Sequence, residues 1–368
     1  MEQSELKDLE YRCIQEEWAY CRAACPLHVD ARSLCQALKN GDYDQARSVL
    51  EKTMPVAAIL GRVCDAPCEA KCKRQEAGGA IQIGRLERFC VSQTERKGRT
   101  LKIPDRGRRA TVLGSGLSGL TVAHDLARKG YRIQVYYPQQ NPEDALHRRF
   151  KDMVPLNAVA EEIEYLQKIG VSFEFKDCNR QLLKELLEEN NLVYVGMDAL
   201  DTHILPCEPE QVDSQTRTTP DKNLFVGGFS ALRGNPSAIW DACEGRSAAV
   251  SMDRVTQKVS LEANREYEGP VSTRLVTSLE GVESIPPRLS EKSEEDDSVS
   301  IQQEAARCLA CECMICVRNC TYLEAYGSYP RSYARQIYNN EAIVKGSHQA
   351  NTLINSCMLC GLCTTLCP

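Results

Sequence analysis

The residues of this chain with the clearest chemistry are four cysteines near its end. Cys357, Cys360, Cys363 and Cys367 are followed by Pro368, which gives the spacing C-x2-C-x2-C-x3-C-P. Thiolates at this spacing hold [4Fe-4S] clusters, because tight turns direct them into one pocket, and the fourth cysteine usually binds a second cluster. The run therefore predicts electron transfer through at least two iron–sulfur clusters.

A second group of cysteines lies upstream of this run. Its members, at the spacing C-x2-C-x4-C-x3-C, are Cys308, Cys311, Cys316 and Cys320, and Cys313 lies inside the motif as an additional thiol. Because two clusters need two sets of ligands, this group supplies the expected second set.

The N-terminal region repeats the spacing of the upstream group with one change. Cys13, Cys21 and Cys25 keep the offsets, but Glu16 stands at the position of the second cysteine. Three further thiols follow at x3 spacing, namely Cys64, Cys68 and Cys72. Cysteine groups at both ends of the chain therefore predict iron–sulfur sites at both ends.

Disulfide bonds and structural zinc are the alternatives to iron for these cysteines. Disulfides need an oxidising compartment, and the segment Met1 to Asp8 lacks the basic and apolar stretches of an export signal. Structural zinc usually binds two separated C-x2-C pairs, unlike the run that ends in Cys-Pro. We interpret the cysteines outside the groups as small buried apolar residues; they are Cys35, Cys90, Cys178, Cys207 and Cys243.

Length and charge limit the class of function. The chain has 368 residues, which is enough for two or three domains. Its net charge of -6 argues against a nucleic-acid partner. No apolar run approaches the roughly 20 residues that a membrane span needs. These features predict a cytoplasmic protein of a reducing, anaerobic setting.

The middle of the chain has the pattern of a dinucleotide-binding fold. Residues 110–113 read as a strand, 120–129 as a helix, and 132–137 as a second strand. Three glycines at the spacing G-x-G-x-x-G join the first strand to the helix: Gly114, Gly116 and Gly119. They would permit a tight turn, the approach of a pyrophosphate, and close packing of helix on strand.

The end of the second strand departs from this pattern. A carboxylate that binds the ribose is expected there, but the chain has Tyr136 and Tyr137. A doubly wound fold that has kept the glycine turn and lost its nucleotide is therefore an alternative.

The segments on either side of this fold differ from it and from each other. Residues 1 to about 95 show helical periodicity, for example at 29–38, interrupted by cysteine loops. A basic connector follows at 96–109. Residues 251–300 are polar and include the acidic run 291–297, which predicts a solvated linker.

Residues 10–250 resemble the small subunit of bacterial glutamate synthase and the N-terminal half of dihydropyrimidine dehydrogenase. Besides the cysteines, the segments that carry the resemblance are 61–64, 83–89, 162–171, 192–196, 223–228 and 242–249. The resemblance implies a helical two-cluster domain followed by an FAD domain, and hence an α/β fold class.

In that family the ligands of the two clusters interleave. The thiolates that the resemblance assigns to one cluster are Cys13, Cys21 and Cys72, and those that it assigns to the other are Cys25, Cys64 and Cys68. Each set lacks one ligand. Glu16 occupies the missing place in the first, and Glu87 occupies the place of a side-chain amide in the second, with Cys90 as an alternative. Carboxylate is a harder ligand than thiolate, so a labile or three-iron cluster is the alternative at either site.

The resemblance also implies contacts to FAD. The residues that would make them are Gly114, Gly116, Gly119, Gly228, Gly245 and Arg246. The family has a whole NAD(P)H-binding domain between the two halves of its FAD domain, but here only the short segment 197–223 separates them. The family's Gly-Gly-Asp reads Gly227-Gly228-Phe229, which removes a hydrogen bond to FAD. A domain without flavin is therefore the alternative to an FAD domain.

Residues 303–368 resemble a C-terminal iron–sulfur extension of flavoprotein subunits from anaerobes, through the segments 305–311, 328–330, 336–340 and 355–363. If ligands are exchanged as in two-cluster ferredoxins, one cluster is bound by Cys308, Cys311, Cys316 and Cys367. The other is then bound by Cys320, Cys357, Cys360 and Cys363. Because the sequence stops directly after the last ligand, we expect further sequence or a partner to cover that cluster.

These observations predict four parts: a helical two-cluster domain (1–100), a truncated doubly wound FAD-type domain (101–255), a linker (256–302) and an α-rich ferredoxin-like domain (303–368). The predicted function is electron transfer through two to four [4Fe-4S] clusters and FAD, in a subunit of a larger anaerobic oxidoreductase. The other subunits would supply NAD(P)H or ferredoxin chemistry. A self-sufficient NAD(P)H-dependent oxidoreductase and a non-redox scaffold are the alternatives.

Overall fold

The computed structural model describes residues 2–97, 104–151, 153–189, 191–289, 296–342 and 356–368. Most of the acidic run 291–297 and part of the basic connector 96–109 lie outside these residues. The chain divides into two compact units. Unit 1 consists of Met1–Tyr20, Ser272–Ser284 and Leu309–Pro368, and unit 2 consists of Cys21–Val271 and Ile285–Cys308.

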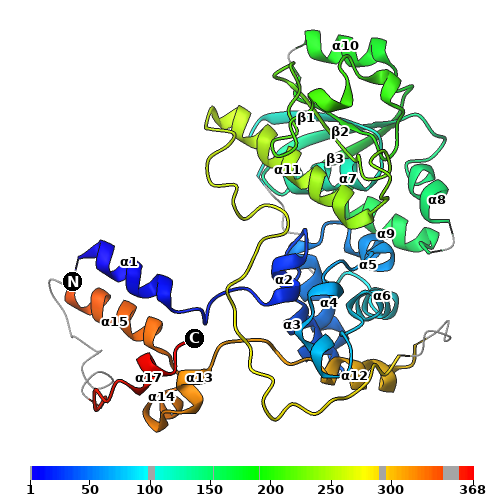
Figure 1. Ribbon diagram of the computed structural model, residues 1–368. Coiled ribbons are helices and arrows are strands. Elements are labelled where there is room, and N and C mark those ends of the chain that lie inside the picture. The colour runs from blue at the N-terminus through cyan, green and yellow to red at the C-terminus, as the bar shows by residue number, and fades with distance from the viewer. Residues whose placement is uncertain (1, 98–103, 152, 190, 290–295, 343–355) are drawn as a thin grey trace. The chain divides into compact units, whose positions relative to one another are not determined.

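Unit 2 begins with a bundle of short helices (Figure 1). They are α2 (Tyr20–Ala24), α3 (Ala31–Lys39), α4 (Tyr43–Thr53), α5 (Ala57–Val63), the 3-10 helices η1 (Glu69–Lys71) and η2 (Lys73–Ala77), and α6 (Ile83–Gln93). Asp30 and Asp42 cap α3 and α4 by accepting hydrogen bonds from the backbone N–H groups of Ser33 and Gln45. Cys25, Cys64, Cys68 and Cys72 lie next to the ends of these helices, whereas Cys35 and Cys90 lie within α3 and α6.

The second part of unit 2 is a five-stranded parallel sheet with the strand order β3-β2-β1-β4-β5. Its strands are β1 (Arg108–Leu113), β2 (Tyr131–Tyr137), β3 (Val171–Phe175), β4 (Val193–Gly196) and β5 (Leu224–Gly227). Its helices are α7 (Leu117–Ala127), α8 (Asp144–Phe150), α9 (Leu156–Lys168), α10 (Arg180–Glu188), the 3-10 helices η3 (Thr202–Ile204) and η4 (Pro209–Gln211), and α11 (Ala238–Gln257). The predicted α/β class is confirmed.

Side chains alternate between the two faces of this sheet, as the pleat of a strand requires. Tyr194 and Phe225 belong to the apolar core on the side of α7 and α11. Leu113 and Val195 belong to a separate core on the side of α10. Both faces are therefore covered, and the carboxyl edge of the sheet is left as the place where a ligand would bind.

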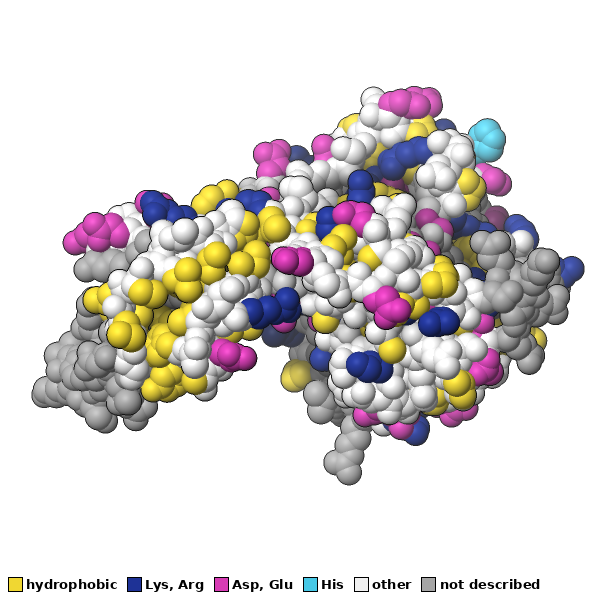
Figure 2. Space-filling model, turned by 60° about the horizontal axis from the view of Figure 1, so that its bottom comes forward, with side chains coloured by type: hydrophobic (Ala, Val, Ile, Leu, Met, Phe, Trp, Pro, Cys, Tyr) yellow, Lys and Arg dark blue, Asp and Glu magenta, His cyan; other side chains and the backbone are white. Residues whose placement is uncertain are grey.

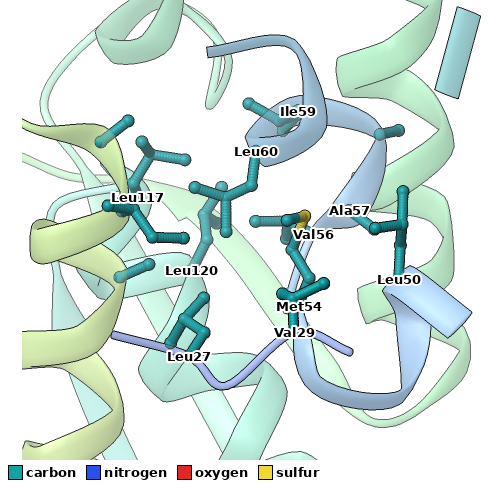
Figure 3. Close-up of a cluster of buried hydrophobic side chains, with 14 of the residues drawn as sticks. Leu27, Val29, Leu50, Met54, Val56, Ala57, Ile59, Leu60, Leu117 and Leu120 are labelled. Carbon is teal, nitrogen blue, oxygen red and sulfur yellow. The ribbon is translucent and has the colours of Figure 1, made fainter. Parts of the chain in front are cut away.

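A continuous apolar core joins the helical bundle to the sheet within unit 2. Figure 3 shows Leu27, Met54 and Leu60 of the bundle packed against Leu117 and Leu120 of α7. Because these side chains are almost fully buried, the start of α7 is fixed by the cysteine-bearing helices.

A buried ionic network reinforces the same contact between bundle and sheet. Arg47 of α4 pairs with Glu161 of α9 at 2.8 Å, and Arg96 pairs with Glu162 of α9 at 2.9 Å. Glu162 is fully buried and also accepts a hydrogen bond from the Ala58 backbone N–H at 2.6 Å. Removing any one partner would leave a buried charge without its counter-charge.

The last helix of unit 2, α12 (Ser298–Ala306), returns to the helical bundle and packs on α3 and α6. Fully buried Glu304 accepts hydrogen bonds from the backbone N–H groups of Gln82 (3.1 Å) and Arg288 (2.7 Å). The segment before α12 was expected to be solvated, but its side chains Arg265 and Leu289 are buried. Leu289 attaches the segment to unit 2 by packing, and Arg265 does so by donating to the Gln215 carbonyl oxygen at 3.1 Å and to the Ser251 hydroxyl.

Unit 1 has its own small core of Val317, Leu323 and Tyr333. Its helices are α1 (Gln3–Arg12), α13 (Ile315–Arg318), α14 (Thr321–Ala325), α15 (Pro330–Ala342) and α17 (Leu362–Thr365). Helix α1 packs on α15, where Arg335 bonds Glu10 at 2.7 Å. Figure 2 shows hydrophobic side chains gathered over this unit, on the left. The exposed ones in the described residues include Tyr326, Met358 and Leu359.

Among the helices of the described residues, none is both long enough and apolar enough to cross a membrane.

Candidate iron–sulfur sites and the nucleotide loop

Three cysteines and one glutamate of the predicted set lie together in unit 2. Cys25 follows α2, Cys64 ends α5, Cys68 precedes η1, and Glu87 lies on α6. The Glu87 carboxyl hydrogen-bonds the Cys64 thiol, and it is close enough to raise the pKa of both Cys25 and Cys68 after burial, which is the larger cause. The helix ends thus bring four residues distant in sequence to one place.

The Glu87 carboxyl in this group is buried and incompletely bonded. Its side chain is 2% exposed, and its Oε2 atom has no hydrogen-bond partner among the described residues. Burial raises the pKa of Glu87 to about 7. An unpaired buried carboxylate oxygen is costly unless a cation or a metal compensates it, so this donor set fits an iron–sulfur cluster with three thiolates and one oxygen ligand.

Backbone N–H groups point toward several of the candidate sulfur atoms. The Sγ atom of Cys25 accepts from the N–H groups of Leu27, His28 and Val29. In unit 1, the Leu359 N–H lies 3.5 Å from the Sγ atom of Cys357. Hydrogen bonds to sulfur stabilise a cluster's thiolates and tune its potential, so these N–H groups suit sulfur atoms that bind a cluster.

Left-handed residues shape three of the cysteine loops. The residue two positions after Cys64, Cys308 and Cys357 has a positive φ in each case: Ala66 (45°), Ala310 (48°) and Leu359 (55°). Non-glycine residues rarely adopt this conformation, which often marks a functional site. Sequence reasoning missed this feature, because alanine and leucine give no signal of a left-handed backbone.

The cysteines expected to form the first N-terminal cluster do not share a unit. Cys13 and Glu16 belong to unit 1, whereas Cys21 and Cys72 belong to unit 2. Glu16 accepts hydrogen bonds from Arg335 at 2.7 Å and from the Tyr329 hydroxyl at 2.8 Å. Burial alone would raise the pKa of Glu16, but these partners lower it below its usual value. Both oxygens of this carboxylate are therefore engaged by arginines and a tyrosine.

The C-terminal cysteines are divided in a similar way. Cys308 is the last residue of unit 2, and the remaining members of both C-terminal sets lie in unit 1. Unit 1 contains a cavity of about 480 Å³. The cysteines that line it are Cys13, Cys313, Cys316, Cys363 and Cys367. Cys320 packs against the small apolar core of the unit beside Cys316 and Cys363, while Cys357 and Cys360 are exposed.

No group of three or more His, Cys, Asp or Glu side chains in the described residues is arranged to hold a single metal ion. A [4Fe-4S] cluster makes a different demand, because each thiolate binds a different iron and the sulfur atoms stand farther apart.

The glycine turn after β1 is closed by a side chain of the chain itself. Asp198, in the loop after β4, accepts from the Ser118 backbone N–H at 3.1 Å and from the Ser118 hydroxyl at the start of α7. A Cβ atom on Gly116 would overlap this carboxylate, and one on Gly228 would lie 2.6 Å from its Oδ1 atom. The structure thus places a buried carboxylate where the glycine pattern predicts a pyrophosphate.

The other polar groups expected to face FAD are also paired within the chain. Glu244 of α11 accepts from the backbone N–H groups of Gly228 (2.8 Å) and Phe229 (2.9 Å). Arg246 donates to Asp125 at 2.9 Å. Gly114 (φ 95°) makes the predicted turn.

The two remaining glycines that were expected to contact FAD, Gly119 and Gly245, allow close packing of secondary-structure elements. A Cβ atom on Gly119 would overlap the Gly114 carbonyl oxygen, and one on Gly245 would overlap the Ser118 carbonyl oxygen. Gly119 therefore lets α7 approach β1, and Gly245 lets α11 approach α7. Both glycines are explained without a bound nucleotide.

An open cleft of about 1000 Å³ adjoins Asp198 at the carboxyl edge of the sheet. Its charged lining is mixed and includes Arg148, Arg149, Asp177 and Asp201. The negative charge of an ionised Asp198 would repel a phosphate bound at this turn. The residues present therefore do not fit FAD, although the turn that would bind it is intact.

Comparison with known families defines the class of the two ends of the chain. Residues 1–99 match the family model of dihydropyrimidine dehydrogenase domain II, 4Fe-4S cluster. Residues 307–368 match the model of a 4Fe-4S dicluster domain. The chain thus has domains of the [4Fe-4S] type at both ends.

Particular relatives are oxidoreductase subunits. The chain is 25% identical over 242 residues to the NADPH-Fe(3+) oxidoreductase subunit beta of Geobacter sulfurreducens, covering 61% of this chain and 33% of that protein. It is 26% identical over 200 residues to the NAD-dependent dihydropyrimidine dehydrogenase subunit PreT of Escherichia coli, covering 51% and 48%. It is 25% identical over 334 residues to the NADPH glutamate synthase small chain of Halomonas elongata, covering 77% and 69%.

These similarities confirm the resemblance that the motifs indicated. The aligned region spans a third of the Geobacter protein and about half of PreT. The similarity therefore covers a part of these proteins and not their whole architecture.

Proposed function

We propose that this chain is an electron-transfer subunit of a larger oxidoreductase, in which [4Fe-4S] clusters pass electrons and no flavin takes part. The observation that carries this proposal is the gathering of thiols around the buried Glu87 in unit 2 and around the cavity of unit 1. A cluster accepts and donates one electron at a time, and the protein sets its potential by burial and by hydrogen bonds to sulfur.

The residues of the chain have specific tasks in this proposal. Cys25, Cys64 and Cys68 supply thiolates to one cluster, and Glu87 supplies an oxygen. The backbone N–H groups beside Cys25 would donate to its sulfur when the thiolate is bound to iron. The ferredoxin-like part, residues 303–368, supplies the C-terminal clusters through Cys316, Cys320 and the final cysteine run.

The sheet domain is the truncated counterpart of an FAD domain in this proposal. Its strand order and glycine turn support that origin, and Asp198 occupies the position of the phosphates. The short segment 197–223 leaves no room for an NAD(P)H domain. Partner subunits, in a reducing cytoplasm, would therefore deliver and collect the electrons, and the sheet would hold the cluster domain in place.

The test is the cofactor content of the full chain purified without oxygen. We expect iron and acid-labile sulfide for at least two clusters, reduction by dithionite, and no FAD released on denaturation. Cluster content below two, or clusters that dithionite does not reduce, would contradict electron transfer. Stoichiometric FAD would contradict the flavin-free sheet and leave the cluster assignment standing.

The reason for the absence of flavin is tested with ADP, which carries the same diphosphate. We expect no ADP binding to the parent chain by calorimetry, because Asp198 holds the Ser118 N–H group. Asp198→Gly frees that group, and the variant should bind ADP. Asp201→Gly, in the same cleft but outside the turn, is the matched control, and ADP binding to it would refute the role of Asp198.

A further inference from the structure

We propose that the N-terminal and C-terminal cysteine motifs exchange one ligand, so that Cys13 serves the cluster of unit 1 and Cys308 serves a cluster of unit 2. The inference rests on the proposed iron–sulfur function and names the ligands of two of its sites. In unit 1 the set is Cys13, Cys313, Cys316 and Cys367. In unit 2 the set is Cys21, Cys35, Cys72 and Cys308.

The cavity of unit 1 carries the first half of this exchange. Cys13 ends α1, and the Arg331 side chain holds its carbonyl oxygen at 3.3 Å, which fixes Cys13 beside α15. The cavity wall contains Cys13 together with Cys313, Cys316 and Cys367. The nearest interacting groups of the Cys316 thiol are these same three thiols and Cys363.

The ligands in this cavity differ from the expected ones. Cys308 is absent from the described lining, and Cys313, the additional thiol of the upstream motif, is present. Cys363 also lines the cavity, but its spacing to Cys357 and Cys360 assigns it to the neighbouring cluster.

The anchoring of Cys308 carries the second half. The preceding residue, Arg307, donates to the carbonyl oxygens of Gly79 (2.6 Å) and Ala80 (3.3 Å) and pairs with Glu304 at 2.6 Å. These contacts attach the end of α12 to the loop between η2 and α6. Cys308 is thereby placed against the helical bundle.

Two thiols of the bundle, Cys35 and Cys72, interact with Cys308, and a third, Cys21, interacts with Cys35. Cys35 of α3 is 2% exposed, and its thiol hydrogen-bonds the thiol of Cys308. Cys21 and Cys72 are the next sulfur atoms close enough to interact with Cys35. Cys72 also interacts directly with Cys308 and accepts from the backbone N–H groups of Ile81 and Arg74. Sulfur atoms from α2, α3, the η1–η2 loop and the end of α12 thus form one group linked through Cys35.

This exchange gives each set four thiolates. In the arrangement implied by the resemblance, Glu16 must complete the first N-terminal cluster, but its carboxylate is bound to Arg335 and Tyr329. Thiolate is the softer ligand and the usual one for iron–sulfur clusters. Cys35, which the sequence places among the structural cysteines, becomes a ligand because α3 carries it to Cys308.

Double variants of the full chain test which thiols share a cluster. Each single change, Cys13→Ala, Cys313→Ala, Cys35→Ala or Cys308→Ala, should lower iron and sulfide by one cluster, about four irons. Two changes in one set should lose no more than one change, whereas changes in different sets should add to about eight irons. We therefore expect Cys13→Ala with Cys313→Ala to lose one cluster, and Cys13→Ala with Cys21→Ala to lose two.

The arrangement implied by the resemblance predicts a different result for two of these variants, and that result would overturn the exchange. In that case Cys13→Ala with Cys21→Ala removes one cluster, and Cys35→Ala removes none. Cys178→Ala is the control for loss of a thiol outside both sets and should keep all iron. A parent chain without iron would instead refute the proposed function itself.

Serine variants provide a second measurement if an alanine variant does not fold. Serine oxygen can stay on iron, so Cys13→Ser and Cys308→Ser should each alter a signal in the reduced-state EPR spectrum without removing it. We expect the two variants to alter different signals. Alteration of the same signal would contradict the assignment of Cys13 and Cys308 to separate clusters.

Discussion

At the scale of single residues, the buried glutamates of unit 2 differ in their hydrogen-bond and ion-pair partners. Glu162 and Glu244 are paired with arginines and accept backbone N–H groups. Glu87 is as deeply buried, but one of its oxygens has no partner in the described structure. The first two acids therefore hold the fold together, whereas Glu87 is suited to a metal.

Substitution of Glu87 should separate a ligand from a structural acid. We expect Glu87→Ala to lose one cluster, about four irons per chain, because its set is left with three thiolates. Glu87→Gln keeps a side-chain oxygen and should retain that iron. The measurement is iron and sulfide content, with exposed Glu76→Ala as the control. An unchanged iron content in Glu87→Ala would remove Glu87 from the ligand set.

The buried carboxyl of Asp198 should give stability a measurable pH dependence. Burial and the neighbouring Asp241 raise the pKa of Asp198 from 3.8 to about 6. Because the folded-state value lies above the ordinary one, ionisation costs folding free energy, and this cost grows between about pH 4 and pH 6 and is complete above pH 6. Asp198→Asn should therefore stabilise the chain on the order of 1–2 kcal/mol at pH 7.5.

The sign of this effect is checked by melting both proteins at several pH values. The melting temperature of Asp198→Asn should exceed that of the parent at pH 7.5, and the difference should shrink at pH 5. Asp201→Asn changes an exposed carboxyl and should show no such trend. A difference that grows toward low pH would contradict a raised pKa of Asp198.

At the scale of secondary-structure elements, α9 connects the sheet to the cysteine-bearing bundle. One of its faces carries Glu161 and Glu162, which bind Arg47 and Arg96. The ion pair of Glu162 is buried, so its loss would leave charges inside the protein. The stability of the cluster domain therefore depends on a helix of the sheet domain.

Glu162→Ala is expected to lower the free energy of unfolding by about 3 kcal/mol or more. It removes the counter-charge of Arg96 and the acceptor of the Ala58 N–H group. Glu164→Ala, on the same helix, breaks an exposed pair with Lys168 and should cost less than about 1 kcal/mol. Thermal melting of the two variants measures both effects, and equal melting temperatures would refute the importance of the network.

The sequence predicted these elements more closely than the contacts between them. The strands expected at 110–113 and 132–137 are observed as Arg108–Leu113 and Tyr131–Tyr137, because β-branched runs and glycine turns are local signals. The place of Asp198 in the glycine turn could not be predicted. It depends on the parallel pairing of β1 with β4, which brings residues distant in sequence to one edge.

At the scale of the whole molecule, two segments pack against parts of the chain that are distant in sequence, and this packing determines which cysteines lie in the same unit. Residues 272–284 belong with the first residues of the chain in unit 1, where the Tyr20 hydroxyl donates to the Leu275 carbonyl oxygen at 2.5 Å. Helix α12 belongs with the bundle in unit 2. The cysteine spacing indicated the metal chemistry. The division of the cysteines between the units follows from long-range packing, which no local sequence pattern predicts.

Glu304 makes the hydrogen bonds that attach α12 to the rest of unit 2, and it forms an ion pair with Arg307. We expect Glu304→Ala to destabilise the chain by about 3 kcal/mol or more, because Arg307 and two backbone N–H groups lose their acceptor. Trypsin should then cleave near Arg307 faster than in the parent. Gln302→Ala, on the same helix, removes a weak contact of 3.4 Å to Tyr43 and should leave cleavage unchanged. Equal cleavage of both variants would contradict this role.

The packing of α12 on α3 also has a consequence for how the protein is made. Helix α3 ends at Lys39 and α12 begins at Ser298, so a ribosome completes the bundle long before it makes the helix that covers it. In the nascent chain, the Cys35 thiol is therefore present before Cys308 has been synthesised, and the apolar surface that α12 later covers is still exposed. We expect iron to be inserted at this site after translation, once α12 has docked on the bundle. The thiols of the nascent chain are then most sensitive to oxygen between the synthesis of α3 and the docking of α12.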